Sequence, residues 1–325
     1  MTLPRIAMVL GDPAGIGPEI AARLLSDPAN LAKAEVLLVA DRAEVAEGAR
    51  IAGVTLPLVE ANAPAAGRVT LRHVPGEAPF ERQKATANGG RYALATLREC
   101  LDLAKSGAVD AVCFAPLNKS SLHAAGMDHN DELHWFAEVL GYNGATSEFN
   151  VCDGLWTCRV TSHIALKDVA EQITVPNILG AIRLIHAALT QAGNASPRIA
   201  VCGLNPHNGD NGAFGREEID VIGPAVEEAR RQGLPAEGPY PADTIFLRAK
   251  EVDAIVTMYH DQGQIAMKLM GFWRGITVAG GVPVPITTCA HGSGFDIQGQ
   301  GVAKVGALQA AFDLACDMGT RRARG

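Results

Sequence analysis

The sequence predicts an α/β protein built on a mostly parallel sheet with helices on both faces. Short β-like runs alternate with helical patterns from end to end, and several of the runs are apolar throughout. Continuous apolar runs are typical of strands that helices cover on both faces, and alternation with helices is typical of parallel strands. A chain of 325 residues is long enough for one large or two medium domains of this kind.

The predicted elements begin close to the N-terminus. The predicted strands are residues 6–10, 36–40, 69–73, 111–115, 148–151, 157–160, 199–203, 254–258 and 276–279. The predicted helices are residues 17–26, 86–105, 177–192, 217–232 and 304–319. Pro18 suits the first turn of the first helix, and Glu19 suits the positive end of its dipole.

The sequence also indicates where one domain ends and the next begins. Polar residues follow a buried strand near 116–119, and we expect the chain to return to the first domain near 271–275. We therefore expect one domain of residues 1–117 and 278–325 and a second of 118–277.

Composition indicates which partners to exclude. The chain has 28 basic and 35 acidic residues and no basic run interleaved with aromatic side chains, so we expect no nucleic-acid partner. It has no apolar run long enough to span a membrane and no recognisable signal peptide, so we expect a cytoplasmic protein without a membrane partner. The cysteines form no Cys-x-x-Cys pair, so we expect small buried side chains rather than disulfides or metal ligands.

Residues 11–20, GDPAGIGPEI, raise the question of a phosphate-binding turn. The dinucleotide fingerprint is Gly-x-Gly-x-x-Gly after a strand, whereas the glycines here are Gly11, Gly15 and Gly17. Pro13 and Pro18 stand where that fingerprint needs backbone N–H groups. The segment therefore predicts a tight loop that begins a helix, not a Rossmann phosphate site.

Residues 290–303, AHGSGFDIQGQGVA, form a second glycine cluster, which precedes the last predicted helix. We expect His291, Gly292 and Ser293 to form a tight turn, and Asp296 offers a carboxylate for a ribose diol. The segment resembles the loop with which the β-decarboxylating dehydrogenases, the isopropylmalate and isocitrate group, hold the adenosine half of NAD. The resemblance implies that these four residues bind NAD, with NADP disfavoured by the carboxylate. The alternative is a surface turn with an ordinary aspartate.

Three histidines each lie among polar residues after a predicted strand. They are His163 in TSHIALKD, His207 in GLNPHNGDNGAFGREEID and His260 in MYHDQG. Open α/β sheets bind ligands at the carboxyl ends of their strands, and imidazole suits zinc and other divalent metals. Three protein ligands would leave positions for substrate oxygens. The alternative is that each histidine is only hydrogen-bonded.

Together these segments resemble the 4-hydroxythreonine-4-phosphate dehydrogenase family over essentially the whole chain. Further matches, in the same order, are APLNKSSLHAAG (115–126), GPYPADTIF (238–246) and YHDQGQIAMKLMGF (259–272). The resemblance implies an isopropylmalate-dehydrogenase-like three-layer αβα fold, two domains around a central cleft, and an obligate homodimer. The first domain would bind the nucleotide, and the second would carry metal, substrate and dimer contacts. One divalent metal (Zn²⁺, Mg²⁺ or Co²⁺) would be held by His163, His207 and His260, one of them supplied across the dimer interface.

The implied reaction is an NAD-dependent oxidation of an alcohol β to a carboxylate, followed by loss of CO₂ from the β-keto acid. A bound metal would lower the pKa of the alcohol. Asp243 and Lys119 are candidates for proton transfer because both lie in matched motifs, although either could be structural. Lys268 matches the family's substrate-contacting lysine and would neutralise an anionic group.

Four aligned substrate positions differ from the family pattern. Glu132 and Leu133 stand where the family has His and Thr, Thr277 where it has Asn, and Ile286 where it has Arg. Loss of that arginine removes a bidentate partner for an anion. We therefore expect a substrate without a phosphate, such as the carboxylated cis-dihydrodiol of the terephthalate branch. The alternatives are 4-hydroxythreonine 4-phosphate, threonate or erythronate 4-phosphate and, from another class, a metal-dependent hydrolase or lyase without a nucleotide.

Overall fold

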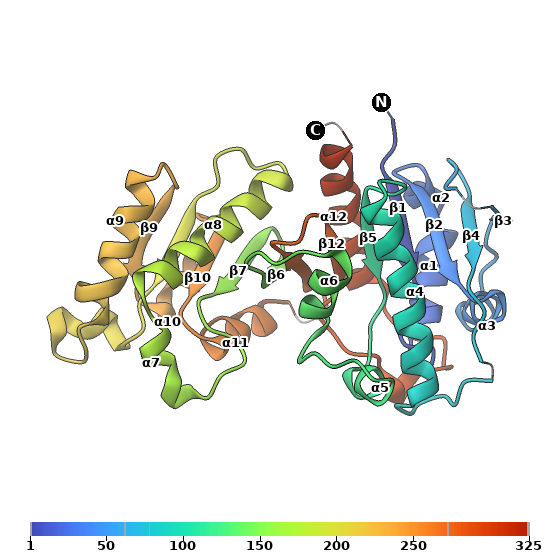
Figure 1. Cartoon of the computed structure of the whole chain (residues 1–325), viewed down its shortest axis with the longest axis horizontal. Helices are drawn as coiled ribbons and strands as arrows, with labels where there is room; N and C mark the ends of the chain where they lie inside the picture. The colour runs from blue at the N-terminus through green and yellow to red at the C-terminus, as the bar shows by residue number, and fades with distance from the viewer. Residues whose placement is uncertain (1, 62, 78, 272, 324–325) are drawn as a thin grey trace. The chain divides into compact units, whose positions relative to one another are not determined.

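The computed structural model describes residues 2–61, 63–77, 79–271 and 273–323, and the chain divides into two compact units. Unit 1 comprises Met1–Gly144 and Ile276–Gly325, and unit 2 comprises Ala145–Gly275. Figure 1 traces both units by residue number. The expected boundary at residue 117 falls earlier than this division, because α5 (Lys119–Ala124) and α6 (Glu132–Leu140) both pack on α4 (Ala87–Lys105) of unit 1.

The sheet of unit 1 has the strand order β3-β4-β2-β1-β5-β12-β11, and its pairs are parallel except for β12 with β11. Its strands are β1 Arg5–Val9, β2 Glu35–Ala40, β3 Leu58–Glu60, β4 Val69–His73, β5 Ala111–Phe114, β11 Ile276–Gly280 and β12 Ile286–Cys289. The five strands predicted in this part of the chain are confirmed, whereas β3 and β12 were not predicted. The parallel order places the loops after β1, β5 and β12 at one edge.

Helices cover both faces of this sheet, as the apolar strands predicted. Val9 and Phe114 belong to the apolar cluster that includes the buried side of α4. On the opposite face α12 (Gly306–Arg322) lies so close that a Cβ at its Gly319 would lie 3.3 Å from Ile6 Cδ1 and 3.4 Å from Ala111 Cβ. The remaining helices are α1 (Gly17–Ser26), which packs on α12, and α2 (Pro28–Leu31) and α3 (Arg42–Ala52), which pack on α1.

The sheet of unit 2 has the order β6-β7-β10-β8-β9, with β6 antiparallel to β7 and the other pairs parallel. Its strands are β6 Ser147–Cys152, β7 Leu155–Arg159, β8 Ile199–Cys202, β9 Ala236–Tyr240 and β10 Ala254–Thr257. Its helices are α7 Val169–Gln172, α8 Val175–Gln191, α9 Gly223–Arg231, α10 Ala242–Ile245 and α11 His260–Gly271. Both α8 and α11 pack on β7 and β10, and α9 packs on β9. The carboxyl ends of β7, β10 and β8 are therefore neighbours.

All seven cysteines are buried, as predicted. Four lie in unit 1 (Cys100, Cys113, Cys289 and Cys316) and three in unit 2 (Cys152, Cys158 and Cys202). Burial raises the pKa of the Cys113, Cys158 and Cys202 thiols to about 12, because the thiolate would lose its hydration.

Among the described residues, no single helix has the length and apolar character needed to cross a membrane. One bent pair, Leu166–Gln172 with Val175–Gln191, meets the requirement of length and composition when its two helices are taken together.

Candidate active site

The loop after β1 is tied to the loop after β5 by a buried aspartate. Asp12 is 1% exposed and accepts hydrogen bonds from the Ser121 hydroxyl at 2.7 Å and from the Ala14 N–H at 2.8 Å. The Asp12 N–H donates to the Pro116 carbonyl at 2.9 Å. Burial raises the pKa of the Asp12 carboxyl above its ordinary value, although both hydrogen bonds oppose that rise. These hydrogen bonds join the GDPAGIGPEI segment (11–20) to the APLNKSSLHAAG segment (115–126).

The same loop contacts the predicted NAD segment. The Ile16 N–H donates to the Ser293 carbonyl at 2.8 Å, and a Cβ at Gly15 would overlap that carbonyl. The Asn118 side-chain amide lies 3.4 Å from the Ser293 hydroxyl. Glycine at position 15 is therefore required by a close backbone approach rather than by a phosphate. Three sequence motifs meet at this edge of unit 1.

The predicted NAD ligands lie in an ordered turn. His291 Nδ1 lies 3.0 Å from the Gly292 carbonyl oxygen, and Ser293 is buried. Asp296 lies in a short turn, Phe295–Ile297, that follows Gly294 in the left-handed region, and its side chain is exposed. An exposed carboxylate can accept hydrogen bonds from a ribose diol, so Asp296 is chemically suited to the predicted NAD contact.

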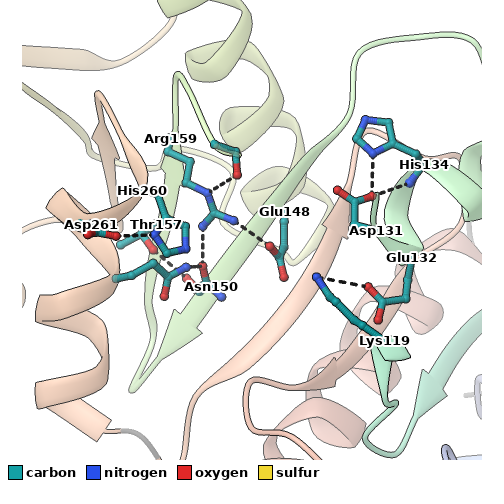
Figure 2. A network of polar contacts seen from close by, with 12 residues as sticks. Lys119, Asp131, Glu132, His134, Glu148, Asn150, Thr157, Arg159, His260 and Asp261 are labelled. Atoms are coloured by element: carbon teal, nitrogen blue, oxygen red, sulfur yellow. Dashed lines mark hydrogen bonds and ion pairs between the residues drawn. The ribbon is translucent and has the colours of Figure 1, made fainter. Parts of the chain in front are cut away.

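Lys119 and Glu132 lie close together at the starts of α5 and α6 (Figure 2). The Lys119 Nζ is 3.9 Å from Glu132 Oε2, and the two side chains are 54% and 19% exposed. Asp131 caps α6 by accepting from the His134 N–H at 3.0 Å, and it contacts His134 Nδ1 at 2.6 Å. Burial opposes ionisation of Asp131, but the contacts with His134 outweigh it and lower the pKa of that carboxyl.

Two of the predicted substrate contacts lie inside the protein. Ile286 is 1% exposed in β12 and Leu133 is 9% exposed in α6, and both belong to the apolar cluster that contains Phe114. Thr277, in β11, is half-buried opposite Thr288 of β12. Direct substrate contact stays a prediction for these positions, and in this conformation Leu133 and Ile286 serve as packing residues. Their apolar character follows from burial.

In unit 2, two of the three predicted metal ligands lie side by side. His163 follows β7 and His260 follows the neighbouring β10, and their ring centroids are 6.1 Å apart. Asp261 Oδ1 contacts His260 Nδ1 at 2.6 Å, which leaves Nε2 as the nitrogen that could bind a metal (Figure 2). Imidazole nitrogens bind zinc at about 2.0–2.1 Å, so a centroid separation of 6.1 Å is compatible with two rings that share one ion.

His207 lies after β8 in a strained loop. The segment Pro206–Gly212 contains a run of positive φ angles, including 53° at His207 and 55° at Asn208. The carboxylate of buried Glu218 holds this loop by accepting from the Leu204 and Asn205 N–H groups, each at 2.7 Å. Such backbone strain is uncommon outside functional sites.

The three predicted metal ligands do not form a complete site in this chain. Within the described residues, no three His, Cys, Asp or Glu side chains are arranged to hold a metal ion.

A cavity of about 590 Å³ lies beside His207 in unit 2. Asp243, from α10, and Gln262, from α11, line it together with Tyr259. Lys268 is exposed in the last turn of α11, whose Ile265 and Leu269 also line the cavity. The structure thus places His207 and Asp243 around one cavity.

Arg159 is a polar centre that the sequence analysis missed. Its side chain is 5% exposed, and it donates to Glu148 at 2.7 Å, to Asn150 at 2.9 Å and to Ser162 at 3.0 Å (Figure 2). Ser162 precedes His163, so this network anchors the segment that carries a predicted metal ligand. The available signal was an arginine at the end of an otherwise buried strand, because an interior cation requires partners.

The comparison with protein families covers most of both units. The family model described as pyridoxal phosphate biosynthetic protein PdxA matches residues 32–315. The chain belongs to the PdxA family. A Pseudomonas aeruginosa protein provisionally named 4-hydroxythreonine-4-phosphate dehydrogenase 2 is 58% identical over 99% of each chain. The crystal structure of 4-hydroxythreonine-4-phosphate dehydrogenase from Klebsiella pneumoniae has a TM-score of 0.83 at 33% identity, covering 97% of this chain and 99% of that one.

PdxA membership confirms the resemblance found in the sequence, and the fold class is confirmed as well. A β-decarboxylating dehydrogenase from Thermococcus kodakarensis, 14% identical with a TM-score of 0.53 over 98% of this chain and 83% of that one, shares the fold. The predicted site residues of this PdxA chain separate into two sets, and their individual roles stay predictions. Unit 1 carries Lys119, Glu132, Leu133, Thr277, Ile286, His291, Gly292, Ser293 and Asp296, and unit 2 carries His163, His207, Asp243, His260 and Lys268.

Proposed function

We propose that the chain is an NAD-dependent dehydrogenase that oxidises the secondary alcohol of 4-hydroxythreonine 4-phosphate or of a closely related phosphorylated hydroxy acid. The observation that carries this proposal is the 58% identity, over 99% of both chains, to a relative named for that activity. The site geometry supports it, because three motifs meet at one edge of unit 1 and two predicted metal ligands meet at the strand ends of unit 2.

The proposed substrate replaces the unphosphorylated one expected from the sequence. That expectation depended on four positions that differ from the family pattern, of which positions 133 and 286 hold the apolar side chains Leu133 and Ile286. Both side chains are buried, so packing accounts for their chemistry and they say little about the ligand. The similarity to relatives named for a phosphorylated substrate therefore favours the phosphorylated alternative.

We assign the residues of this chain the following roles. His163, His207 and His260 would hold a divalent metal, and Asp296 would hold the ribose of NAD. Such a metal would supply Lewis-acid polarisation of the alcohol, and NAD would supply the hydride acceptor that oxidation to a β-keto acid, which can lose CO₂, requires. Lys268 would neutralise an anionic substrate group.

Lys119 and Asp243 are the proposed proton carriers. Lys119 Nζ lies 3.9 Å from Glu132 Oε2, close enough for an ion pair that would orient the lysine side chain toward the substrate. Asp243 lines the same cavity as His207 and is exposed, so it can exchange protons with solvent. The alcohol proton released on oxidation and the proton that restores a methylene after CO₂ loss are the two transfers these groups would serve.

We also propose a homodimer whose interface completes the metal site. Unit 2 exposes large apolar side chains, including Leu247 at 85%, Leu269 at 84% and Ile265 at 60%. Ile265 and Leu269 line the cavity that His207 and Asp243 share, so covering these side chains would also close that cavity. Light scattering after size-exclusion chromatography measures the mass, and a monomer at micromolar concentration would contradict this part of the proposal.

The decisive experiment measures NADH formation at 340 nm with purified protein, added divalent metal and a substrate panel. The panel contains 4-hydroxythreonine 4-phosphate, threonate 4-phosphate, unphosphorylated threonate and a carboxylated cis-dihydrodiol. A phosphorylated compound should have the highest kcat/KM, and removal of its phosphate should cost roughly 30-fold or more, since each charged partner lost costs about 2 kcal/mol. Efficient use of the dihydrodiol would restore the expectation from the sequence. Substrate loss without NADH would instead indicate a hydrolase or lyase.

A further inference from the structure

We propose that Glu19 and Arg23 are positioning residues that hold the 290–303 loop in shape for the adenosine half of the dinucleotide, a role that rests on the proposed NAD dependence. Glu19 belongs to the GDPAGIGPEI motif, whose purpose the reaction leaves open. Its side chain is 1% exposed, and Glu19 Oε1 accepts from the Ala303 N–H at 3.0 Å. Arg23, one turn along α1, reaches the same oxygen at 3.2 Å and donates to the Gly301 carbonyl at 2.5 Å.

The loop is attached to the N-terminal part of the chain at three places. Near its start, the Ile16 N–H holds the Ser293 carbonyl at 2.8 Å. In its middle, the Gln83 side-chain amide donates to the Gln298 carbonyl at 3.3 Å. At its end, Glu19 and Arg23 hold residues 301 and 303. The exposed turn with Asp296 lies between these attachments, so they determine where that carboxylate is presented.

The arrangement of Glu19 is costly unless it serves the loop. Burying a carboxylate requires several donors, yet all the donors here reach Oε1. Oε2 is buried and has no hydrogen-bond partner among the described residues. An acidic residue that only favoured the helix dipole would be as effective at the surface. Glu19 instead forms an ion pair with Arg23 and accepts a hydrogen bond from the Ala303 N–H, which is the last attachment of the loop.

The chemistry of Oε2 offers a graded set of variants. Glu19→Gln retains an acceptor for the Ala303 N–H and places an amide nitrogen near the position of Oε2, so it loses mainly the charge that attracts Arg23. Glu19→Ala loses both contacts, and Arg23→Ala loses the Gly301 contact and leaves the carboxylate without its cation. A matched control is Asp110→Asn, because Asp110 is a buried carboxylate paired with Arg5 at 2.7 Å, at the strand ends opposite the loop.

The experiment compares these four variants with the wild type in three measurements. They are NADH affinity by calorimetry, hydrogen exchange of residues 294–303 without cofactor, and kcat at saturating NAD. Glu19→Ala and Arg23→Ala should weaken NADH binding and raise KM for NAD roughly tenfold, since each loses a charge-assisted hydrogen bond. Both should speed exchange in the loop, with kcat changed by less than about threefold. Glu19→Gln should lie between them and the wild type, and Asp110→Asn should lower the melting temperature without changing NADH affinity.

The outcomes separate this inference from the proposed function. If the wild type binds NADH and Glu19→Ala binds it equally well, with unchanged loop exchange, the positioning role is wrong and the proposed function stands. If Asp110→Asn weakens NADH binding as much as Glu19→Ala does, the effect is general destabilisation and the inference is also overturned. If the wild type does not bind NADH, the proposed function fails, and this inference fails with it.

Discussion

Ile286→Arg tests whether position 286 faces the substrate or the protein interior. Arginine is the residue that the phosphate-using family pattern has there, so a pocket residue would tolerate it. Ile286 is 1% exposed in β12, which pairs with β5 and β11, and it belongs to the same apolar cluster as Leu133. The guanidinium would therefore enter an interior that is formed by apolar side chains.

The magnitude follows from this burial. Removing a fully buried isoleucine forfeits about 1.5–3 kcal/mol of apolar burial, part of which the arginine stem recovers. An unpaired buried charge costs about 3–5 kcal/mol. Because a domain is stable by only about 5–15 kcal/mol, a net loss near 4 kcal/mol is severe. At about 2–4 °C per kcal/mol for a unit of this size, the melting temperature should fall by about 10 °C or more.

Thermal unfolding followed by circular dichroism measures this effect. Ile286→Val should cost about 0.5–1.5 kcal/mol and keep activity, since it only shortens the side chain. Val59→Arg is the matched control, because Val59 is an aliphatic strand residue of the same unit that is 39% exposed. If Ile286→Arg melts within about 2 °C of the wild type and gains kcat/KM for a phosphorylated substrate, the side chain faces the ligand and the assignment to the core is refuted.

Three further predictions concern the metal, the nucleotide and a buried carboxyl. His163→Ala and His260→Ala should each reduce metal affinity at least roughly tenfold, as measured by mass spectrometry of bound metal, and full retention in both would contradict their role as ligands. Asp296→Ala should raise KM for NAD roughly tenfold with a smaller effect on KM for the acid substrate, and equal use of NADP by the wild type would contradict the role of that carboxylate. Burial raises the pKa of the Asp12 carboxyl, so the folded chain binds that proton more tightly than the unfolded chain does. The stabilisation that this proton provides is present below the ordinary pKa of aspartate, and it is lost as the pH rises through the raised pKa. Asp12→Asn should therefore flatten the dependence of the unfolding free energy on pH in that acidic window, while Asp12→Ala, which removes the acceptor of two hydrogen bonds, should destabilise at every pH by about 2 kcal/mol.

Local patterns predicted the elements whose signals lie within one segment. The helix Gly17–Ser26 was predicted with its observed bounds, because Pro18 sets its first turn and the apolar positions repeat along it. β12 was missed because Pro283 and Pro285, which lie just before it, argue against a central strand. Its burial depends on pairing with β5 and β11, of which β5 is distant in the sequence. The placement of α5 and α6 in unit 1 was also missed, since it depends on packing against α4, which no short stretch of sequence records.

The candidate site shows the same division. Of the three histidines predicted to share a metal, His163 and His260 lie side by side, because parallel strands bring their carboxyl ends together. The hydrogen bond between Ser121 and Asp12 could not be predicted, since 109 positions separate the two residues. The interior position of Ile286 was hidden as well, because alignment with a family pattern specifies which residue is replaced but not which side chains surround the replacement.

The reactivity of the buried cysteine thiols can be used to measure local unfolding of the protein. An aromatic disulfide reagent reacts only with a thiolate. Burial and a raised pKa therefore keep each cysteine unreactive until the structure around it unfolds locally. Unit 1 carries four of these thiols and unit 2 carries three, which peptide mapping resolves after labelling in dilute denaturant. Equal labelling rates in both sets would mean that the two units open in one cooperative event, whereas unequal rates would rank their local stabilities without any engineered probe.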